Sequence, residues 1–165
     1  MEFKTDIFKA FDKNWALLSA GNKDSFNTMT ISWGMLGTIW SRPAATVYVR
    51  TSRCTHEFME REDTFTVSFF PESMKDVLKT AGTRSGREID KMHLPGLELR
   101  GDTDAIVFRN AEITLVCKKL FVQRLNEDNI PKEVLASHYP TRDMHDMYIG
   151  EVIDVIRGQA DGMEQ

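Results

Sequence analysis

The sequence is poor in cysteine, with only two thiols in 165 residues, at positions 54 and 117. They lie far apart and outside any Cys-x-x-Cys pattern, which suits two free thiols in a reducing cytosol rather than a disulfide scaffold. Long apolar runs are also missing, and Lys4, Asp6 and Lys9 interrupt the start, where a signal peptide would be apolar. We therefore expect a cytoplasmic protein that does not bind a membrane.

An excess of positive charge is lacking too, because 21 lysines and arginines face 25 acidic residues and the net charge is −4. Broad binding to nucleic-acid phosphates requires a basic face, so no nucleic-acid partner is expected. A barrel that binds nucleotides or single strands without redox chemistry is therefore the disfavoured alternative. The length and ordinary composition suit one globular domain over residues 1–165.

Several catalytic motifs are absent. The sequence contains no Gly-x-Gly-x-x-Gly, no Walker pattern and no Gly-x-Ser-x-Gly. Its four histidines, at positions 56, 93, 138 and 145, show no metal-ligand spacing, so no metal site is predicted. We therefore predict no catalytic side chain and expect a bound cofactor to carry the chemistry.

The segment 47–58 is the most informative stretch that is present. An alternating apolar run ends in Arg50, Ser52, Arg53 and Thr55, directly before a short predicted helix. Arginines, hydroxyls and the backbone amides of a helix N-terminus together favour binding of a small dianion such as a phosphate. A solvated strand end that leads into an ordinary helix fits the same composition.

Three blocks in order resemble one known family: Asn-Thr-Met-Thr-Ile-Ser-Trp at 27–33, Trp-Ser-Arg-Pro at 40–43, and the segment 47–58. They resemble the flavin reductase-like family, and most closely its flavoredoxin-like branch, over about residues 15–156. The resemblance implies an FMN-binding split β-barrel, usually a homodimer with flavin sites near the subunit interface. Thr51 and Cys54 stand where the family pattern has proline and an aromatic residue.

The resemblance also implies which residues bind FMN. The segment 50–55 is expected to hold the phosphate, the strand 27–32 to face the flavin pyrimidine edge, and the loop 83–86 to lie close to the flavin. Met29, Trp33 or Trp40 would supply an apolar face to the ring, although a place in the core or at a dimer interface suits Trp40 equally well. The predicted cofactor-binding residues are Asn27, Thr28, Met29, Thr30, Ser32, Arg50, Ser52, Arg53, Thr55, Thr83, Ser85 and Gly86.

Lys91 is a weaker candidate, because a short helix would direct it outward. That helix is predicted near Gly86 from the capping-box spacing of Ser85 and Glu88, which by itself is a sufficient structural explanation of this loop.

The hydrophobic pattern predicts a mainly β protein with short helices, an antiparallel split barrel with Greek-key-like connections. Thr5, Thr55 and Ser73 are the predicted N-caps, and a disordered tail is expected at about 158–165. Strands are predicted at 15–20, 27–33, 46–50, 65–70, 105–108, 111–125 and 145–156, helices at 4–12, 55–61, 74–81 and within 129–138, and a loop at 34–42.

Together these features predict an FMN-binding oxidoreductase that accepts electrons from NAD(P)H and passes them to flavin or another small acceptor. The alternative is a flavoredoxin-type carrier that exchanges electrons with a redox protein partner. The same site residues serve both functions, and the sequence does not separate them.

Overall fold

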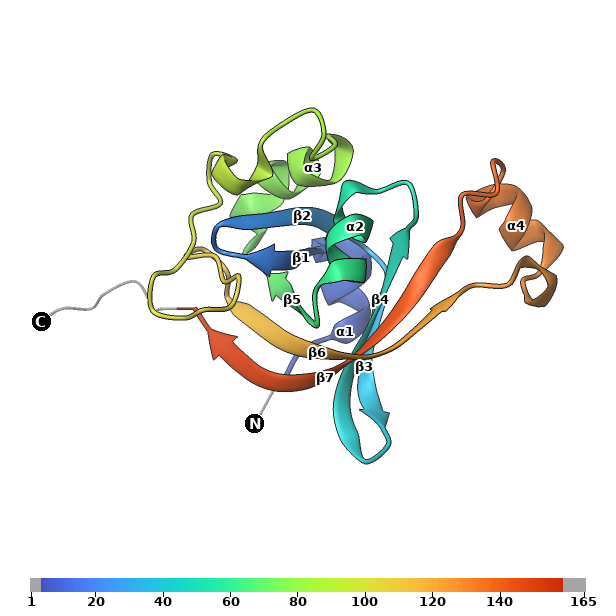
Figure 1. The fold of residues 1–165 in the computed structure, drawn as a ribbon, viewed down its shortest axis with the longest axis horizontal. Coiled ribbons are helices and arrows are strands. Elements are labelled where there is room, and N and C mark those ends of the chain that lie inside the picture. Colours follow the sequence, from blue (N-terminus) through green and yellow to red (C-terminus); the bar gives the residue numbers. More distant parts are fainter. Residues whose placement is uncertain (1–3, 159–165) are drawn as a thin grey trace, which may run out of the picture.

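A seven-stranded antiparallel sheet forms the body of the protein, of which the computed structural model describes residues 4–158. The sheet curls into a partly closed barrel (Figure 1). Its strand order is β2-β1-β5-β6-β7-β4-β3, and across residues 4–158 its edge strands β2 and β3 do not pair, so the barrel is split. The strands are β1 (Ala16–Asn22), β2 (Ser25–Ile31), β3 (Gly34–Ile39), β4 (Arg42–Arg50), β5 (Thr64–Phe69), β6 (Ile113–Arg124) and β7 (His145–Arg157).

The predicted mainly β fold class is confirmed. Strands β4 to β7 have the Greek-key order, because β5, β6 and β7 are consecutive neighbours and β4 returns to lie beside β7. The two long strands β6 and β7 bend around the barrel with register shifts at Val116/Cys117 and Lys119/Phe121, and such bulges increase the local bend of a strand.

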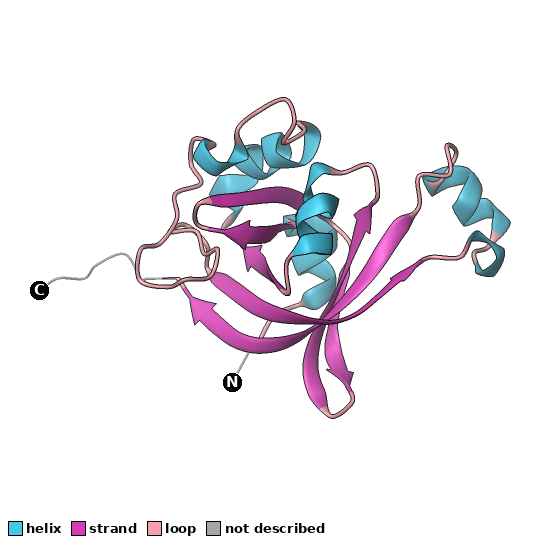
Figure 2. Cartoon of the chain, in the orientation of Figure 1, coloured by secondary structure: helices cyan, strands magenta, loops and turns pink. Residues whose placement is uncertain are grey.

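Short helices cover the ends of the barrel (Figure 2). Helix α2 packs against β1, β2 and β4, and α3 packs mainly against β2. Helix α4 lies in the β6–β7 connection and projects away from the barrel (Figure 1). No described helix has the length and apolar composition needed to cross a membrane. The helices are α1 (Ile7–Lys9), which continues in the π-helical turn η1 (Ala10–Asn14), α2 (Cys54–Arg61), α3 (Lys75–Thr83) and α4 (Lys132–His138), with 3-10 turns at Glu72–Met74, Lys91–His93 and Glu127–Asn129.

Strand β1 is buried on both faces, which explains why its first five residues are apolar apart from Ser19. Leu18 contributes to the core inside the barrel together with Val47 and Val67. Its neighbour Leu17 points to the opposite face and packs in a second core with Leu78 of α3. Because successive side chains of a strand alternate, one short run anchors both cores.

The prediction of a loop at 34–42 is wrong. Residues 34–39 form strand β3, which pairs with β4 from Gly34↔Val47 to Ile39↔Arg42. The glycines made this segment look irregular. Gly34 is instead required by packing, since a Cβ atom there would lie 2.4 Å from the ring of Phe11. Strand pairing and this close contact outweigh the weak local propensity of the segment.

Four further local predictions are corrected. Asp6, Arg53 and Met74 occupy the N-cap positions predicted for Thr5, Thr55 and Ser73. Residues 105–108 form no strand and contribute only the isolated bridge Leu99↔Phe108.

The chain around Ser85 also differs from the prediction. It makes a single turn closed by the Glu88 amide on the Ser85 carbonyl at 3.0 Å, rather than a helix. At the C-terminus, the Gly158 amide donates to the Glu112 carbonyl at 2.7 Å. The rest of the predicted tail, 159–165, lies outside the described residues.

Candidate functional site

A pocket of about 170 Å³ opens at the N-terminus of α2 and is called the first pocket. It lies between the end of β4, the strand β2 and the loop that follows α3. The structure therefore brings together three segments that are far apart in the sequence. Seven of the predicted site residues line it: Asn27, Ser52, Arg53, Thr55, Thr83, Ser85 and Gly86.

The buried amide of Asn27 joins the three walls of this pocket. Its Nδ2 donates to Thr55 Oγ1 at 2.8 Å, so the Thr55 hydroxyl braces α2 against β2 instead of capping the helix. Gly86 lies directly on the same amide, because a Cβ atom there would be 2.2 Å from Asn27 Oδ1. Any larger residue at position 86 would push the loop out of the pocket wall.

Lys91 is the main surprise of the first pocket, because its side chain is 3% exposed and points inward rather than outward. Its Nζ donates to the carbonyls of Thr28 at 3.0 Å and Ala81 at 2.7 Å, and so ties β2 to α3. Burial, followed by the positive charge of Arg53, lowers the pKa of Lys91 to about 8. The ammonium therefore loses its proton in a mildly alkaline range.

Arg53 lines both the first pocket and a neighbouring second pocket of about 220 Å³. Both terminal nitrogens of its guanidinium donate to the Gly82 carbonyl at 3.1 Å, which holds the charge between the two pockets. Burial and then the nearby Arg50 lower the pKa of Arg53. A ligand that spans the two pockets would pass this arginine.

The second pocket is lined by the far end of β2 and by residues from β4 and β7. Five predicted site residues line it, namely Met29, Thr30, Ser32, Arg50 and Arg53, together with Ile31, Trp33, Tyr48 and His145. Backbone and short polar side chains thus face an aromatic wall. Trp40, offered as an alternative ring contact, instead lies in the β3–β4 turn, with its ring centroid 6.5 Å from that of Phe121.

Arg50 and Ser52 line different pockets, although both bond to Asp143. The Arg50 guanidinium donates to the carbonyls of Asp143 at 2.5 Å and His138 at 2.8 Å, so it anchors the segment between β6 and β7. Ser52 stays in the first pocket, where its hydroxyl donates to Asp143 Oδ2 at 2.6 Å. The local sequence could not reveal either partner, because Asp143 lies about 90 positions downstream.

Thr28 is the one predicted residue that lines neither pocket. Its side chain is fully buried, with its hydroxyl donating to the Leu18 carbonyl at 3.2 Å and accepting from Ser19 Oγ at 2.9 Å. Only its backbone is useful to the site, through the carbonyl that holds Lys91.

His145 was not predicted and lies in the wall of the second pocket. Its Nδ1 shares a hydrogen bond of 2.7 Å with the Tyr139 hydroxyl. Burial, followed by the positive charge of Arg50, lowers the pKa of His145 to about 4, so the imidazole is neutral at neutral pH. Nothing in the sequence around position 145 marks it, since its surroundings come from the β6–β7 connection.

A possible metal cluster of His56, Glu60 and Asp146 lies on the other side of α2, with its ligand atoms within 4.8 Å of one another. Asp146 is already paired with His56 at 2.7 Å and with Arg124 at 2.8 Å, and Tyr148 donates to Glu60 at 2.6 Å. These contacts make the cluster an ion-pair network that fastens α2 to β7.

Comparison with known proteins matches residues 8–164 to the family model described as flavin reductase like domain. The chain belongs to this family. No curated protein matches the sequence.

Solved structures of low sequence identity share the fold of this family member. The FMN-binding protein of Thermus thermophilus is 24% identical, with a TM-score of 0.68 over 87% of this chain and 70% of its own. Flavoredoxin of Methanosarcina acetivorans is 21% identical, with a TM-score of 0.66 over 88% and 69%. The styrene monooxygenase flavin reductase of Pseudomonas putida S12 is 18% identical, with a TM-score of 0.66 over 89% and 80%.

The first pocket leads to a prediction about pH. A bound phosphate dianion would hold Lys91 protonated, so affinity for a phosphate monoester should fall as the pH rises through about 8, by up to about tenfold for each further pH unit. Equilibrium titrations between about pH 7.5 and about pH 9.5 measure this slope. The titrations use the Cys54→Ser variant, because the Cys54 thiol also lines this pocket and free thiols ionise in this pH range.

The matched control is Lys91→Met in the same background, which should bind more weakly at about pH 7.5 but show a flatter profile. Equal slopes with and without Lys91 would show that another group is titrating.

Proposed function

We propose that this protein binds FMN non-covalently and acts as an oxidoreductase. The observation that carries the proposal is the pair of adjoining pockets with Arg53 in the wall of both. One pocket has cations, hydroxyls and a helix N-terminus, which suit a phosphate. The other has a strand edge and aromatic side chains, which suit a flavin ring. The family membership supports the same assignment.

Each part of the first pocket has a role in this proposal. Arg53 and Ser85 would bind phosphate oxygens directly, with the first amides of α2, which have no partner within a helix. Ser52 would join them by turning its hydroxyl from Asp143 to the ligand. Lys91 would contribute its charge from the pocket floor, while Asn27, Thr55 and Gly86 keep the walls in place. Thr83 and Arg84 complete the rim.

In the second pocket, the β2 segment Met29–Ser32 would face the polar edge of the ring, and Trp33 and Tyr48 its apolar surface. When bound, the flavin supplies the redox chemistry by accepting a hydride or electrons from a donor. NADH or NADPH is the proposed donor, because hydride transfer between stacked rings depends on positioning more than on proton transfer. A cytoplasmic location is also part of the proposal, because two free thiols suit a reducing compartment.

The first test removes the phosphate ligand. Arg53→Ala should weaken FMN binding by about 1.5–3 kcal/mol, the usual contribution of a hydrogen bond to a charged group, or about ten- to hundredfold in Kd. Riboflavin lacks the phosphate and should bind Arg53→Ala and the unaltered protein about equally. FAD should bind more weakly than FMN, because the pocket is built for a terminal phosphate. Fluorescence titration measures all three ligands.

Arg61→Ala is the matched control, because Arg61 lies at the opposite end of α2 and pairs with Glu62. It should leave FMN affinity unchanged. An equal loss of riboflavin affinity in Arg53→Ala would assign Arg53 to the ring or to folding instead of to the phosphate.

The second test separates an enzyme from a carrier. Anaerobic mixing of the FMN-bound protein with NADH or NADPH should bleach the yellow flavin absorbance, and excess free FMN should be reduced in turn. The alternative function is a carrier that serves a redox protein partner, and the fold similarity to a flavoredoxin is the reason to test it. Bleaching by dithionite but by neither nucleotide would support the carrier and refute the reductase.

A homodimer is part of the proposal. The exposed Trp40 in the β3–β4 turn lies beside Phe121 of β6, with ring centroids 6.5 Å apart, and together they form an apolar surface. Light scattering at micromolar concentration should show a dimer, and Trp40→Asp should shift it toward the monomer by placing a charge in this contact. A monomeric unaltered protein would contradict this expectation.

A further inference from the structure

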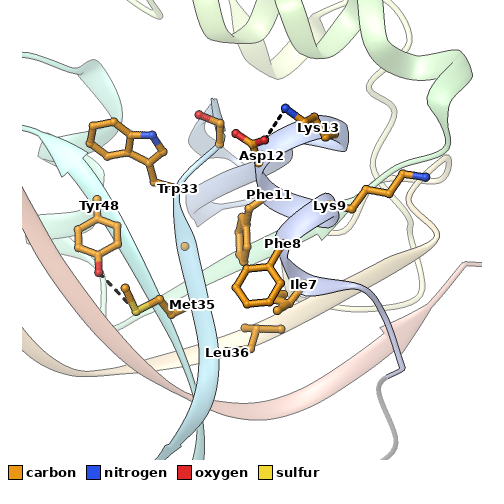
Figure 3. Close-up of a pocket in the computed structure, with 12 residues that line it drawn as sticks. Ile7, Phe8, Lys9, Phe11, Asp12, Lys13, Trp33, Met35, Leu36 and Tyr48 are labelled. Atoms are coloured by element: carbon orange, nitrogen blue, oxygen red, sulfur yellow. Dashed lines mark hydrogen bonds and ion pairs between the residues drawn. The ribbon is translucent and has the colours of Figure 1, made fainter. Parts of the chain in front are cut away.

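A groove of about 940 Å³ runs between the N-terminal helical turns and strand β3 (Figure 3). We call it the aromatic groove. Phe8 and Phe11 form one wall, and Trp33, Met35 and Tyr48 form the other. Phe8 is 85% exposed and Met35 60% exposed, so two large apolar side chains at its edge remain in water. Burying them against a ligand would be favourable.

The groove adjoins the second pocket. Ser32, Trp33 and Tyr48 line both spaces. A molecule in the groove would therefore reach the place that the proposed function assigns to the flavin ring. Ligand sites that are largely apolar with a few polar groups at one end are common in proteins.

The groove offers hydroxyl donors to a ligand and has few charged side chains. The Tyr48 hydroxyl donates to Met35 Sδ at 3.8 Å, and a thioether sulfur is a weak acceptor that a carbonyl oxygen would displace. Asp12 pairs with Lys13 at 2.7 Å, which leaves Lys9 as the remaining charge of the lining. A nearly neutral groove does not compensate the charge of a dinucleotide diphosphate, but it accepts an uncharged ligand.

We propose that the aromatic groove binds planar, uncharged aromatic carbonyl compounds of the quinone class. The ring would pack between the aromatic walls, and a carbonyl oxygen would accept from Ser32 or Tyr48 at the end shared with the second pocket. Binding itself follows from the groove alone. The role of such a compound as electron acceptor rests on the proposed function.

The probe is 2,3-dimethyl-1,4-naphthoquinone, whose substituted ring has no open position next to its carbonyls for addition of the Cys54 thiol. Calorimetric titration of the purified full-length protein should show one site. The double variant Phe8→Ser with Met35→Gln should raise the Kd at least about tenfold, because it removes apolar contacts. Neither residue lines the two flavin pockets, so FMN affinity should stay within about twofold.

The matched control is Val122→Ser with Ile153→Ser, which removes two exposed apolar side chains outside the groove. It should leave the Kd for the quinone within about twofold. A second control uses 2,3-dimethylnaphthalene, which lacks the carbonyl oxygens and should bind more weakly than the quinone.

Three results would overturn the proposal. Equal quinone affinity in the groove variant and its control would place the ligand elsewhere. Selective loss of NAD⁺ binding in the groove variant would assign the groove to the nicotinamide nucleotide. Dissociation of a dimer by the groove variant, but not by Trp40→Asp, would make the groove an interface between copies. The titration needs no flavin, so it fails or succeeds independently of FMN binding and of reductase activity.

Discussion

The buried amide of Asn27 is the contact on which the candidate site depends. It bonds Thr55 on α2 and lies against the backbone of Gly86, so a strand, a helix and a loop are held at fixed distances. A buried amide left without partners would cost about 1–3 kcal/mol, which opposes any separation of these elements. Among the described residues, no buried side-chain nitrogen or oxygen lacks a partner. The pocket walls therefore form together with the fold.

Positive charge in the first pocket is held in an unusual way. Lys91 and Arg53 bond to backbone carbonyls, and within residues 4–158 neither forms an ion pair. Arg87, by contrast, is paired with Glu57. Because carbonyls orient a cation without neutralising it, the charge of Lys91 and Arg53 remains available to an anion. The lowered pKa values of both groups reflect the cost of keeping them there.

Shared lining residues link the first pocket, the second pocket and the aromatic groove. Trp33 and Tyr48 stand between the second pocket and the aromatic groove, and Arg53 stands between the second pocket and the first. Strand β3 is essential to this arrangement, because it carries one side of the groove and its Gly34 admits the ring of Phe11. The fold thus places the charged first pocket next to the second pocket, and the second pocket next to the apolar aromatic groove.

Local sequence determined most of the strands, α2, and the grouping of hydroxyls and arginines at 50–55, because alternation, helix starts and short motifs depend on neighbouring residues. Together with the three motif blocks, it also indicated the split barrel and eleven of the twelve predicted residues that line the two pockets. Strand β3, the buried Lys91, the partners of Arg50 and the position of His145 were decided by the tertiary structure alone. Each depends on strand pairing or on burial against residues distant in the chain, and no local pattern encodes which distant carbonyl or ring will fill that place.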